Sequence, residues 1–141
     1  MTKSSIKEAT KQMKKQHLVF VYGTLRQAQS NHKLLGDAYC HGTGSSRDRY
    51  AMYISGSYPY VISTEARYPI VGELYAVDDD TLAKLDKMEG HPRYYNRREI
   101  TVDVEGIEYL AWMYFRDPHG TLLPTGDYQS FSSRLQKTGN P

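Results

Sequence analysis

Glu89 is the side chain whose place in the sequence points most directly to acid–base chemistry. The stretch 78–89 predicts a helix, and Gly90 ends it. At about 100° per residue, Glu89 falls on the same face as Leu82 and Leu85, which is the apolar face of that helix. Burial and the negative end of the helix dipole both raise the pKa of a carboxyl group there. Glu89 is therefore a candidate for proton transfer near neutral pH.

A structural role for Glu89 is the alternative, because three arginines follow it closely in the sequence. The carboxylate could form an ion pair at the rim of the domain with Arg93, Arg97 or Arg98. The same arginines could instead attract an anionic group of a substrate. The sequence leaves both interpretations open.

The second candidate is the loop that begins with Gly23 and Thr24. It follows the stretch 18–22, which is apolar on both faces and predicts a central strand. A glycine at the end of a strand allows a sharp turn, in which consecutive backbone N–H groups can face an anion. A plain turn is the alternative. A donor-rich loop together with a buried carboxylate predicts an acyl-transfer site that needs no nucleophilic side chain.

Glu73 is a further carboxylate that the strand pattern places among apolar residues. Alternation along the strand puts it on the same face as Val71, Tyr75 and Val77. We expect a structural carboxylate here, bonded to the opening loop or to a tyrosine hydroxyl, rather than a catalytic one.

Cysteine chemistry and metal binding find little support in the sequence. Cys40 and His41 are adjacent, so on a strand their side chains point to opposite faces. The five histidines show neither the His-x-His nor the His-Glu-x-x-His spacing of metal ligands. His91 could tune the nearby Glu89, although a surface position at the helix end is the simpler interpretation. We expect no metal and no cofactor.

Strand patterns outnumber helical patterns along the rest of the chain. A short helix is predicted at 31–35, with Asn31 as its N-cap and Gly36 as its end. We expect extended structure at 38–54, an irregular edge segment at 58–62, a strand at 70–77, and a hairpin formed by 100–104 and 107–115. These elements predict the α+β class, with a mixed, strongly curled, barrel-like sheet and about two short helices.

Length and charge predict one domain with polar ends. The 141 residues suffice for one hydrophobic core, and we expect a flexible polar tail at 1–16, a domain at 17–135 and a disordered tail at 136–141. Residues 1–16 carry five lysines and one glutamate, whereas the rest carries 13 basic and 15 acidic residues, which disfavours a nucleic-acid surface. No signal peptide or membrane span is apparent, and a single cysteine fits a reducing compartment, so we expect a cytoplasmic protein that binds no membrane.

Several short motifs follow one another in a distinctive order. They are residues 19–26 (VFVYGTLR) with Asn31-His32, residues 72–78 (GELYAVD), residues 85–92 (LDKMEGHP), and Tyr95 with Arg97. This ordered set resembles the γ-glutamylcyclotransferase-like superfamily, and most of all its γ-glutamylamine cyclotransferase, or AIG2-like, group. The resemblance spans about residues 17–116.

The resemblance implies an enzyme that cyclises γ-glutamyl compounds. In such enzymes the α-amine of the substrate attacks its own γ-carbonyl group, giving 5-oxoproline and a free amine. The catalytic glutamate of the family falls on Glu89. The positions that contact the γ-glutamyl group fall on Tyr22, Gly23, Thr24 and Leu25, chiefly through their backbone, and in some relatives on a tyrosine that matches Tyr114.

Departures from the family pattern concern the leaving group. The family often has glycine and proline where this chain has Ala28 and Ser30, and cysteine where it has His91. The partner implied is a small γ-glutamyl molecule, and both a monomer and a homodimer fit. The alternative function is a non-catalytic binding or regulatory module on the same fold.

Overall fold

One mixed β-sheet curls until its two ends meet, in a computed structural model that describes residues 16–117 and 120–132. Its strands are β1 (His17–Val21), β2 (Tyr39–Ser55), β3 (Tyr58–Ile62), β4 (Tyr68–Val77), β5 (Asn96–Val104), β6 (Ile107–Phe115) and β7 (Thr121–Leu122). The helices are the 3-10 helix η1 (His32–Leu35) and the α-helix α2 (Asp79–Glu89), and residues 128–132 are also helical. The tails predicted at 1–16 and 136–141 lie outside the described residues, except for Gln16.

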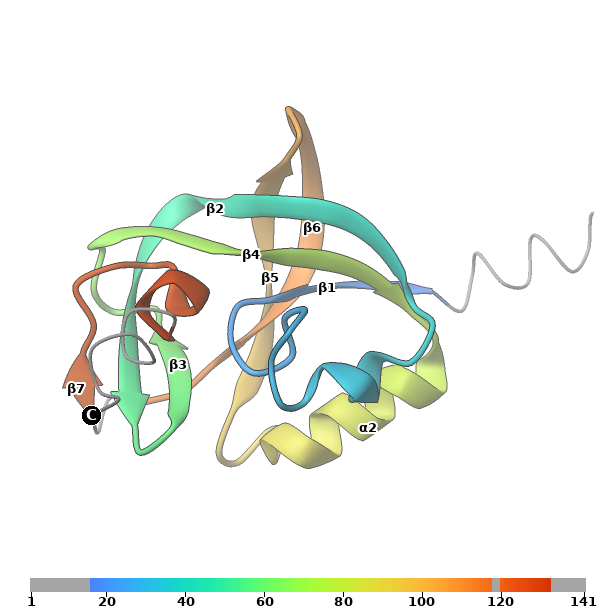
Figure 1. Ribbon diagram of the computed structural model, residues 1–141, viewed down its shortest axis with the longest axis horizontal. Coiled ribbons are helices and arrows are strands. Elements are labelled where there is room, and N and C mark those ends of the chain that lie inside the picture. The colour runs from blue at the N-terminus through green and yellow to red at the C-terminus, as the bar shows by residue number, and fades with distance from the viewer. Residues whose placement is uncertain (1–15, 118–119, 133–141) are drawn as a thin grey trace, which may run out of the picture.

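The sheet closes because its outermost strands find additional partners. Along the order β1-β4-β2-β3-β6-β5, β1 also pairs with β6, parallel, at Val19 and Trp112, and β2 also pairs with β5. The long strand β2 arches over the molecule beside β4 (Figure 1). A register shift between Ser45 and Arg49 accompanies its bend. The predicted α+β class with a curled, barrel-like sheet is confirmed.

Strand β1 is apolar on both faces because each face covers a different core cluster. Phe20 packs inside the curled sheet with residues such as Leu74, whereas Val19 and Val21 face the other side. On that side the sheet packs against Leu85 of α2. The strand is covered on both faces as predicted, but it stands at one end of the sheet order, and its second neighbour, β6, pairs with it only at Val19 and Trp112.

Helix α2 begins and ends at the residues that its sequence predicts. The Asp78 side chain accepts a hydrogen bond from the Thr81 amide at 2.8 Å, and Gly90 ends the helix in the left-handed conformation, with φ of 70°. Leu82 and Leu85 are buried. Because the helix ends at Gly90, the position of Glu89, the last helical residue, is set by the end of α2.

The segment 58–62 is not the irregular edge that its proline suggested. It is the regular strand β3, which pairs with β2 on one side and with β6 at Val61 and Phe115 on the other. Pro59 lies near the start of the strand, where a proline is tolerated. Its neighbours from Tyr60 to Ile62 are buried, so β3 belongs to the core.

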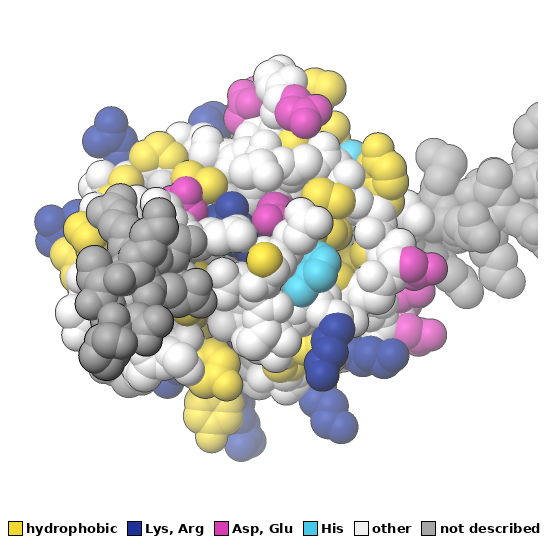
Figure 2. All heavy atoms as spheres, viewed as in Figure 1, with side chains coloured by type: hydrophobic (Ala, Val, Ile, Leu, Met, Phe, Trp, Pro, Cys, Tyr) yellow, Lys and Arg dark blue, Asp and Glu magenta, His cyan; other side chains and the backbone are white. Residues whose placement is uncertain are grey.

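Charges of both signs share the face seen in Figure 2. Acidic side chains gather over the tip of the β5–β6 hairpin, and basic ones lie along the lower edge. No helix within the described ranges is long and apolar enough to cross a membrane.

Candidate active site

A cavity of about 550 Å³ opens where the loop after β1 meets the end of α2. Its wall also includes the end of β6, the end of β2 and the start of β3. The six residues that the sequence singled out all line it: Tyr22, Gly23, Thr24, Leu25, Glu89 and Tyr114. Segments far apart in the sequence thus meet in a single cavity.

The loop after β1 is held in a compact turn by its own bonds. The Arg26 amide donates to the Gly23 carbonyl at 3.0 Å, and the Asn31 amide donates to the Thr24 carbonyl at 2.8 Å. The Asn31 side chain donates to the Thr24 hydroxyl at 3.0 Å and does not cap η1, so the predicted N-cap bond is absent. Within the described residues, the amides of Thr24 and Leu25 have no backbone acceptor. In general, consecutive backbone N–H groups without an acceptor can bind an anion.

Gly23 is required for space. A Cβ atom on this residue would lie 2.6 Å from Cγ of Pro59 in β3. Because the ring of Pro59 is rigid, a side chain at position 23 would push the loop away from β3. The closeness of these two segments therefore depends on glycine.

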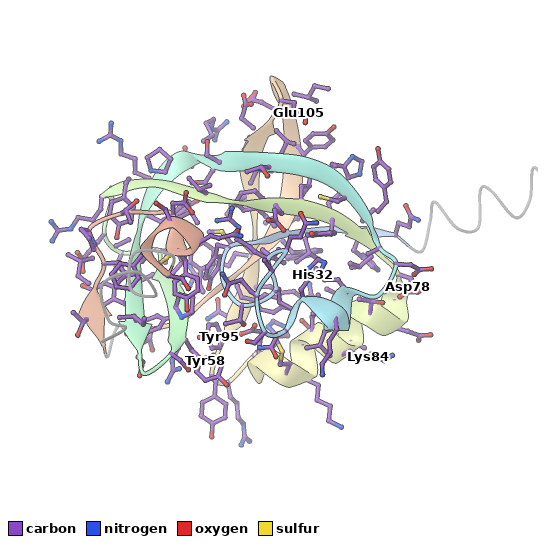
Figure 3. The ribbon with its side chains drawn as sticks, in the orientation of Figure 1. His32, Tyr58, Asp78, Lys84, Tyr95 and Glu105 are labelled. Atoms are coloured by element: carbon purple, nitrogen blue, oxygen red, sulfur yellow. The ribbon has the colours of Figure 1, made fainter. Side chains whose placement is uncertain are left out.

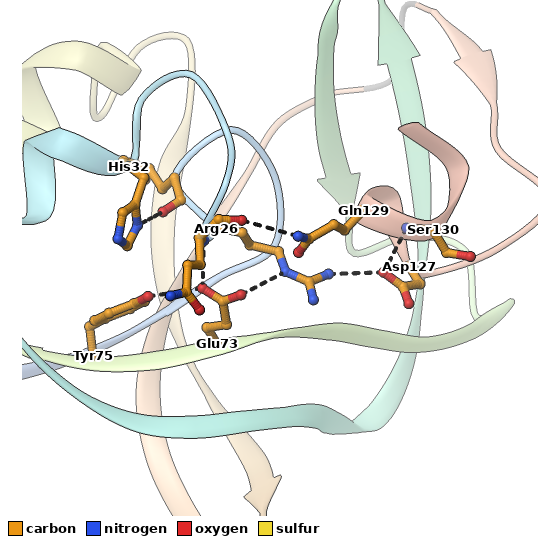
Figure 4. Close-up of polar contacts among 9 residues, drawn as sticks. Arg26, His32, Glu73, Tyr75, Asp127, Gln129 and Ser130 are labelled. Atoms are coloured by element: carbon orange, nitrogen blue, oxygen red, sulfur yellow. Dashed lines mark hydrogen bonds and ion pairs between the residues drawn. The ribbon is translucent and has the colours of Figure 1, made fainter. Parts of the chain in front are cut away.

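Glu73 holds the loop from below, as the sequence predicted for a structural carboxylate (Figure 4). Its Oε1 accepts bonds from the Gln27 amide at 2.8 Å and from the Tyr75 hydroxyl at 2.9 Å. Its Oε2 lies 3.4 Å from Nε of Arg26, whose guanidinium also donates to Asp127 at 2.9 Å. Glu73 and Arg26 are both buried, so this network fixes the base of the loop in the protein interior.

The last described segment of the chain also supports the loop. The side-chain amide of Gln129 donates to the Gln27 carbonyl at 3.1 Å. Together with the bond between Arg26 and Asp127, this contact ties residues 127–129 to the loop (Figure 4).

Glu89 is half-buried in the cavity wall. Burial raises the pKa of its carboxyl group to about 7. The alternative ion pair with Arg93, Arg97 or Arg98 is absent in the described part of the chain; Arg97 pairs with Asp86 instead, and Arg98 donates to Asn96. The carboxylate can thus exchange a proton near neutral pH.

Tyr114 is fixed beside Glu89 by a polar network behind the cavity. Its hydroxyl donates to Oδ1 of Asp86 at 2.7 Å, and Arg97 binds both oxygens of Asp86 at 2.9 and 3.1 Å. Burial disfavours the charged form of Asp86, but the bonds from Arg97 and Tyr114 outweigh it and lower its pKa. Burial raises the pKa of Tyr114, so its hydroxyl stays protonated.

Tyr22 fastens three strand ends together. Its buried hydroxyl donates to the Tyr114 carbonyl at 2.9 Å and accepts from the Val61 amide at 3.3 Å. The hydroxyl of Tyr22 therefore has a structural role.

Tyr95 and Arg116 are among the cavity residues that were not predicted as site residues. Tyr95 carried part of the family resemblance without being assigned a role, and burial raises the pKa of its hydroxyl to about 12. Arg116 lines the cavity just beyond β6. Strand alternation puts Arg116 on the same side as Tyr114, and this signal could have identified it.

The remaining sequence candidates lie away from the cavity. His91 accepts a bond from the Arg97 amide at 3.2 Å, and Cys40 is exposed. Among the described residues, no group of three or more His, Cys, Asp or Glu side chains could hold a metal ion.

The curled sheet with its helix has the fold of AIG2-like proteins. An AIG2-like protein from Mus musculus superimposes with a TM-score of 0.74 and 27% identity, over 81% of this chain and 88% of the mouse chain. The family model described as "Gamma-glutamyl cyclotransferase, AIG2-like" matches residues 19–130, and the chain belongs to that family.

Sequence relatives carry names from the same family. A protein of Methanocaldococcus jannaschii named "Putative gamma-glutamylcyclotransferase" is 41% identical over 116 residues, which cover 80% of this chain and 96% of the relative. A bovine protein named gamma-glutamylaminecyclotransferase is 37% identical over 98 residues, covering 63% of this chain and 58% of the relative.

Proposed function

We propose that this protein is a γ-glutamyl cyclotransferase that releases 5-oxoproline and a free amine from a γ-glutamyl-amine or a related γ-glutamyl conjugate. One observation carries the proposal. The carboxyl group of Glu89, with a pKa of about 7, shares a cavity with the free amides of Thr24 and Leu25.

Glu89 would move the proton that the cyclisation requires. The attacking nitrogen begins as an ammonium group and ends as a lactam N–H, so it loses two protons. Glu89 accepts one as the new C–N bond forms, and donates it to the leaving nitrogen as the old C–N bond breaks. The second proton is released to water, where it converts the free amine to its ammonium form. A pKa near 7 allows Glu89 both to accept and to release this proton at neutral pH.

The loop would hold the glutamyl group in the conformation that reacts. The amides of Thr24 and Leu25 can bind its α-carboxylate or the oxyanion that develops on the γ-carbonyl oxygen. Attack within one well-oriented molecule has an effective molarity of ~10⁵ M or more. Orientation and one proton carrier therefore suffice, without a nucleophilic side chain.

A non-catalytic binding or regulatory module explains this cavity less well than an enzyme does. A protein that only bound an acidic ligand would gain nothing from a carboxylate in the cavity wall, since Glu89 would repel the ligand when ionised. The cytoplasmic location and the choice between monomer and homodimer stay predictions.

The test is release of 5-oxoproline, measured by mass spectrometry, from γ-glutamyl-amines, γ-glutamyl amino acids and glutathione. We expect the wild-type protein to release it from at least one class, and Glu89→Gln to lose on the order of 10²- to 10⁴-fold in rate. Glu99→Gln is the matched control, because Glu99 is exposed on β5. Full activity in Glu89→Gln, with the fold intact, would rule out the role of Glu89.

A further inference from the structure

Arg116 is a charged residue of the cavity that the proposed proton transfer does not use. Its backbone amide donates to the Val61 carbonyl at 3.0 Å, which anchors it at the ends of β6 and β3. Its side chain lies over two aromatic rings, with Cζ 5.4 Å from the ring centre of Tyr60 and 5.5 Å from that of Tyr95. Both distances lie within the range of a cation–π contact, and Arg116 also forms a side-chain hydrogen bond with Tyr95, so these two aromatic residues hold the guanidinium group in place.

No carboxylate within the described ranges forms an ion pair with Arg116. Arg26 and Arg97, in contrast, each pair with at least one acidic side chain. A guanidinium group has five N–H donors, so beyond the bond to Tyr95 donors remain for the two oxygens of a carboxylate. Arg116 is thus a cation in the cavity wall that has no acidic partner among the described residues.

Glu89 and Arg116 act on the same tyrosine. Burial and the charge of Glu89 raise the pKa of Tyr95, and Arg116 partly opposes that rise. The proton carrier and the cation therefore both lie within electrostatic reach of Tyr95. Tyr58, the first residue of β3, lines the same cavity (Figure 3).

The cavity then offers two separate places for an anion. One is the pair of free amides at Thr24 and Leu25, and the other is Arg116. A volume of about 550 Å³ lies in the range of sites that enclose a whole small ligand. A γ-glutamyl amino acid has two carboxylates, one on the glutamyl part and one on the leaving part. The cavity therefore has as many anion sites as this substrate has carboxylates.

We propose that Arg116 binds a carboxylate on the leaving part of the substrate, so that the site selects γ-glutamyl conjugates whose amine carries an acidic group, such as γ-glutamyl amino acids. This inference rests on the proposed function and adds the substrate class. The loop amides bind the glutamyl carboxylate, and Arg116 binds the second carboxylate through a charge-assisted hydrogen bond.

The experiment compares two substrates that differ by one carboxylate, γ-glutamyl-alanine and γ-glutamyl-ethylamide. We expect the wild-type protein to favour γ-glutamyl-alanine in kcat/KM by about tenfold or more. In Arg116→Met the value for γ-glutamyl-alanine should fall on the order of 10- to 100-fold, mainly through KM, because the contact is a binding contact. The value for γ-glutamyl-ethylamide should change by less than about threefold.

Two further variants give the comparison its controls. Arg116→Lys keeps the charge and should restore part of the preference. Arg98→Met removes an exposed arginine whose Cζ lies 5.5 Å from the ring centre of Phe115, and it should leave both substrates unchanged. Melting temperatures of all variants show whether the contact between Arg116 and Tyr60 is needed for the fold itself.

Each contrary result has its own meaning. Equal losses for both substrates in Arg116→Met, or no loss for either, overturn the assignment of Arg116. If that variant does not fold, the wild-type ratio decides, and equal kcat/KM for the two substrates overturns the inference alone. No 5-oxoproline from either substrate with the wild-type protein overturns the proposed function as well.

Discussion

Glu73 accepts a hydrogen bond from the backbone amide of Gln27 at 2.8 Å, and this bond joins β4 to the loop that follows β1. The same carboxylate holds Arg26, so one buried side chain satisfies both the backbone and the charge of the loop. The position of the loop amides in the cavity thus depends on a residue outside the cavity wall.

Replacing Glu73 should therefore harm both the fold and the site. In Glu73→Gln, Arg26 keeps Asp127 but loses its buried partner, and we expect the free energy of unfolding to fall by about 3 kcal/mol. Urea unfolding measures this loss. Glu108→Gln, an exposed change on β6, should lie within about 0.5 kcal/mol of wild type. Equal stability of the two variants would contradict the bracing role.

The contact between Gly23 and Pro59 predicts a size limit at position 23. Gly23→Ala adds a Cβ where Pro59 already stands, so we expect about 1–3 kcal/mol of destabilisation and at least a tenfold loss of 5-oxoproline release. Thr24→Ser keeps the hydroxyl that Asn31 binds and should be nearly neutral. Removing the clash in the double variant Gly23→Ala, Pro59→Ala should recover part of the activity. A wild-type rate in Gly23→Ala would show that the loop need not lie against β3.

The raised pKa of Glu89 predicts the pH dependence of turnover. The free enzyme must carry an ionised Glu89 to accept a proton, so kcat/KM should rise with pH and level off, with a midpoint near the pKa of about 7. Rates of 5-oxoproline release between pH 5 and 9 measure it. A midpoint near 4.5, the ordinary value of a glutamate, would mean that Glu89 is solvated or is not the group that titrates.

The same carboxyl group predicts a pH-dependent cost to stability. Between about pH 4.5 and 7 the unfolded chain loses the proton of Glu89 while the folded protein keeps it, so wild-type stability falls as the pH rises. Glu89→Gln does not ionise. It should match wild type near pH 4 and exceed it by about 2–3 kcal/mol at pH 8. Urea unfolding at both pH values checks this, with Glu99→Gln as a variant whose difference from wild type stays constant. A constant difference for Glu89→Gln too would contradict the burial of its charge.

Local patterns were enough to predict α2 and the position of Glu89. The cap at Asp78, the stop at Gly90 and the apolar face with Leu85 depend only on neighbours within a few residues. The hairpin of β5 and β6 followed in the same way from its Glu105–Gly106 turn.

Features that depend on distant pairing could not be read in this way. The burial of β3 follows from its contact with β6 at Val61 and Phe115, residues that no local pattern joins. The closure of the sheet also brings the end of β6 beside the loop, although alternation from Tyr114 already indicated the side on which Arg116 lies. The structural role of Glu73, in contrast, was predictable, because alternation along its strand already placed it among buried residues.

The bond between the Gln129 side chain and the Gln27 carbonyl links residues 102 positions apart. During synthesis, the loop leaves the ribosome long before Asp127 and Gln129 exist to hold it. The part of the site that is made first is therefore completed last, and a nascent chain carries the loop without the contacts that give it its shape.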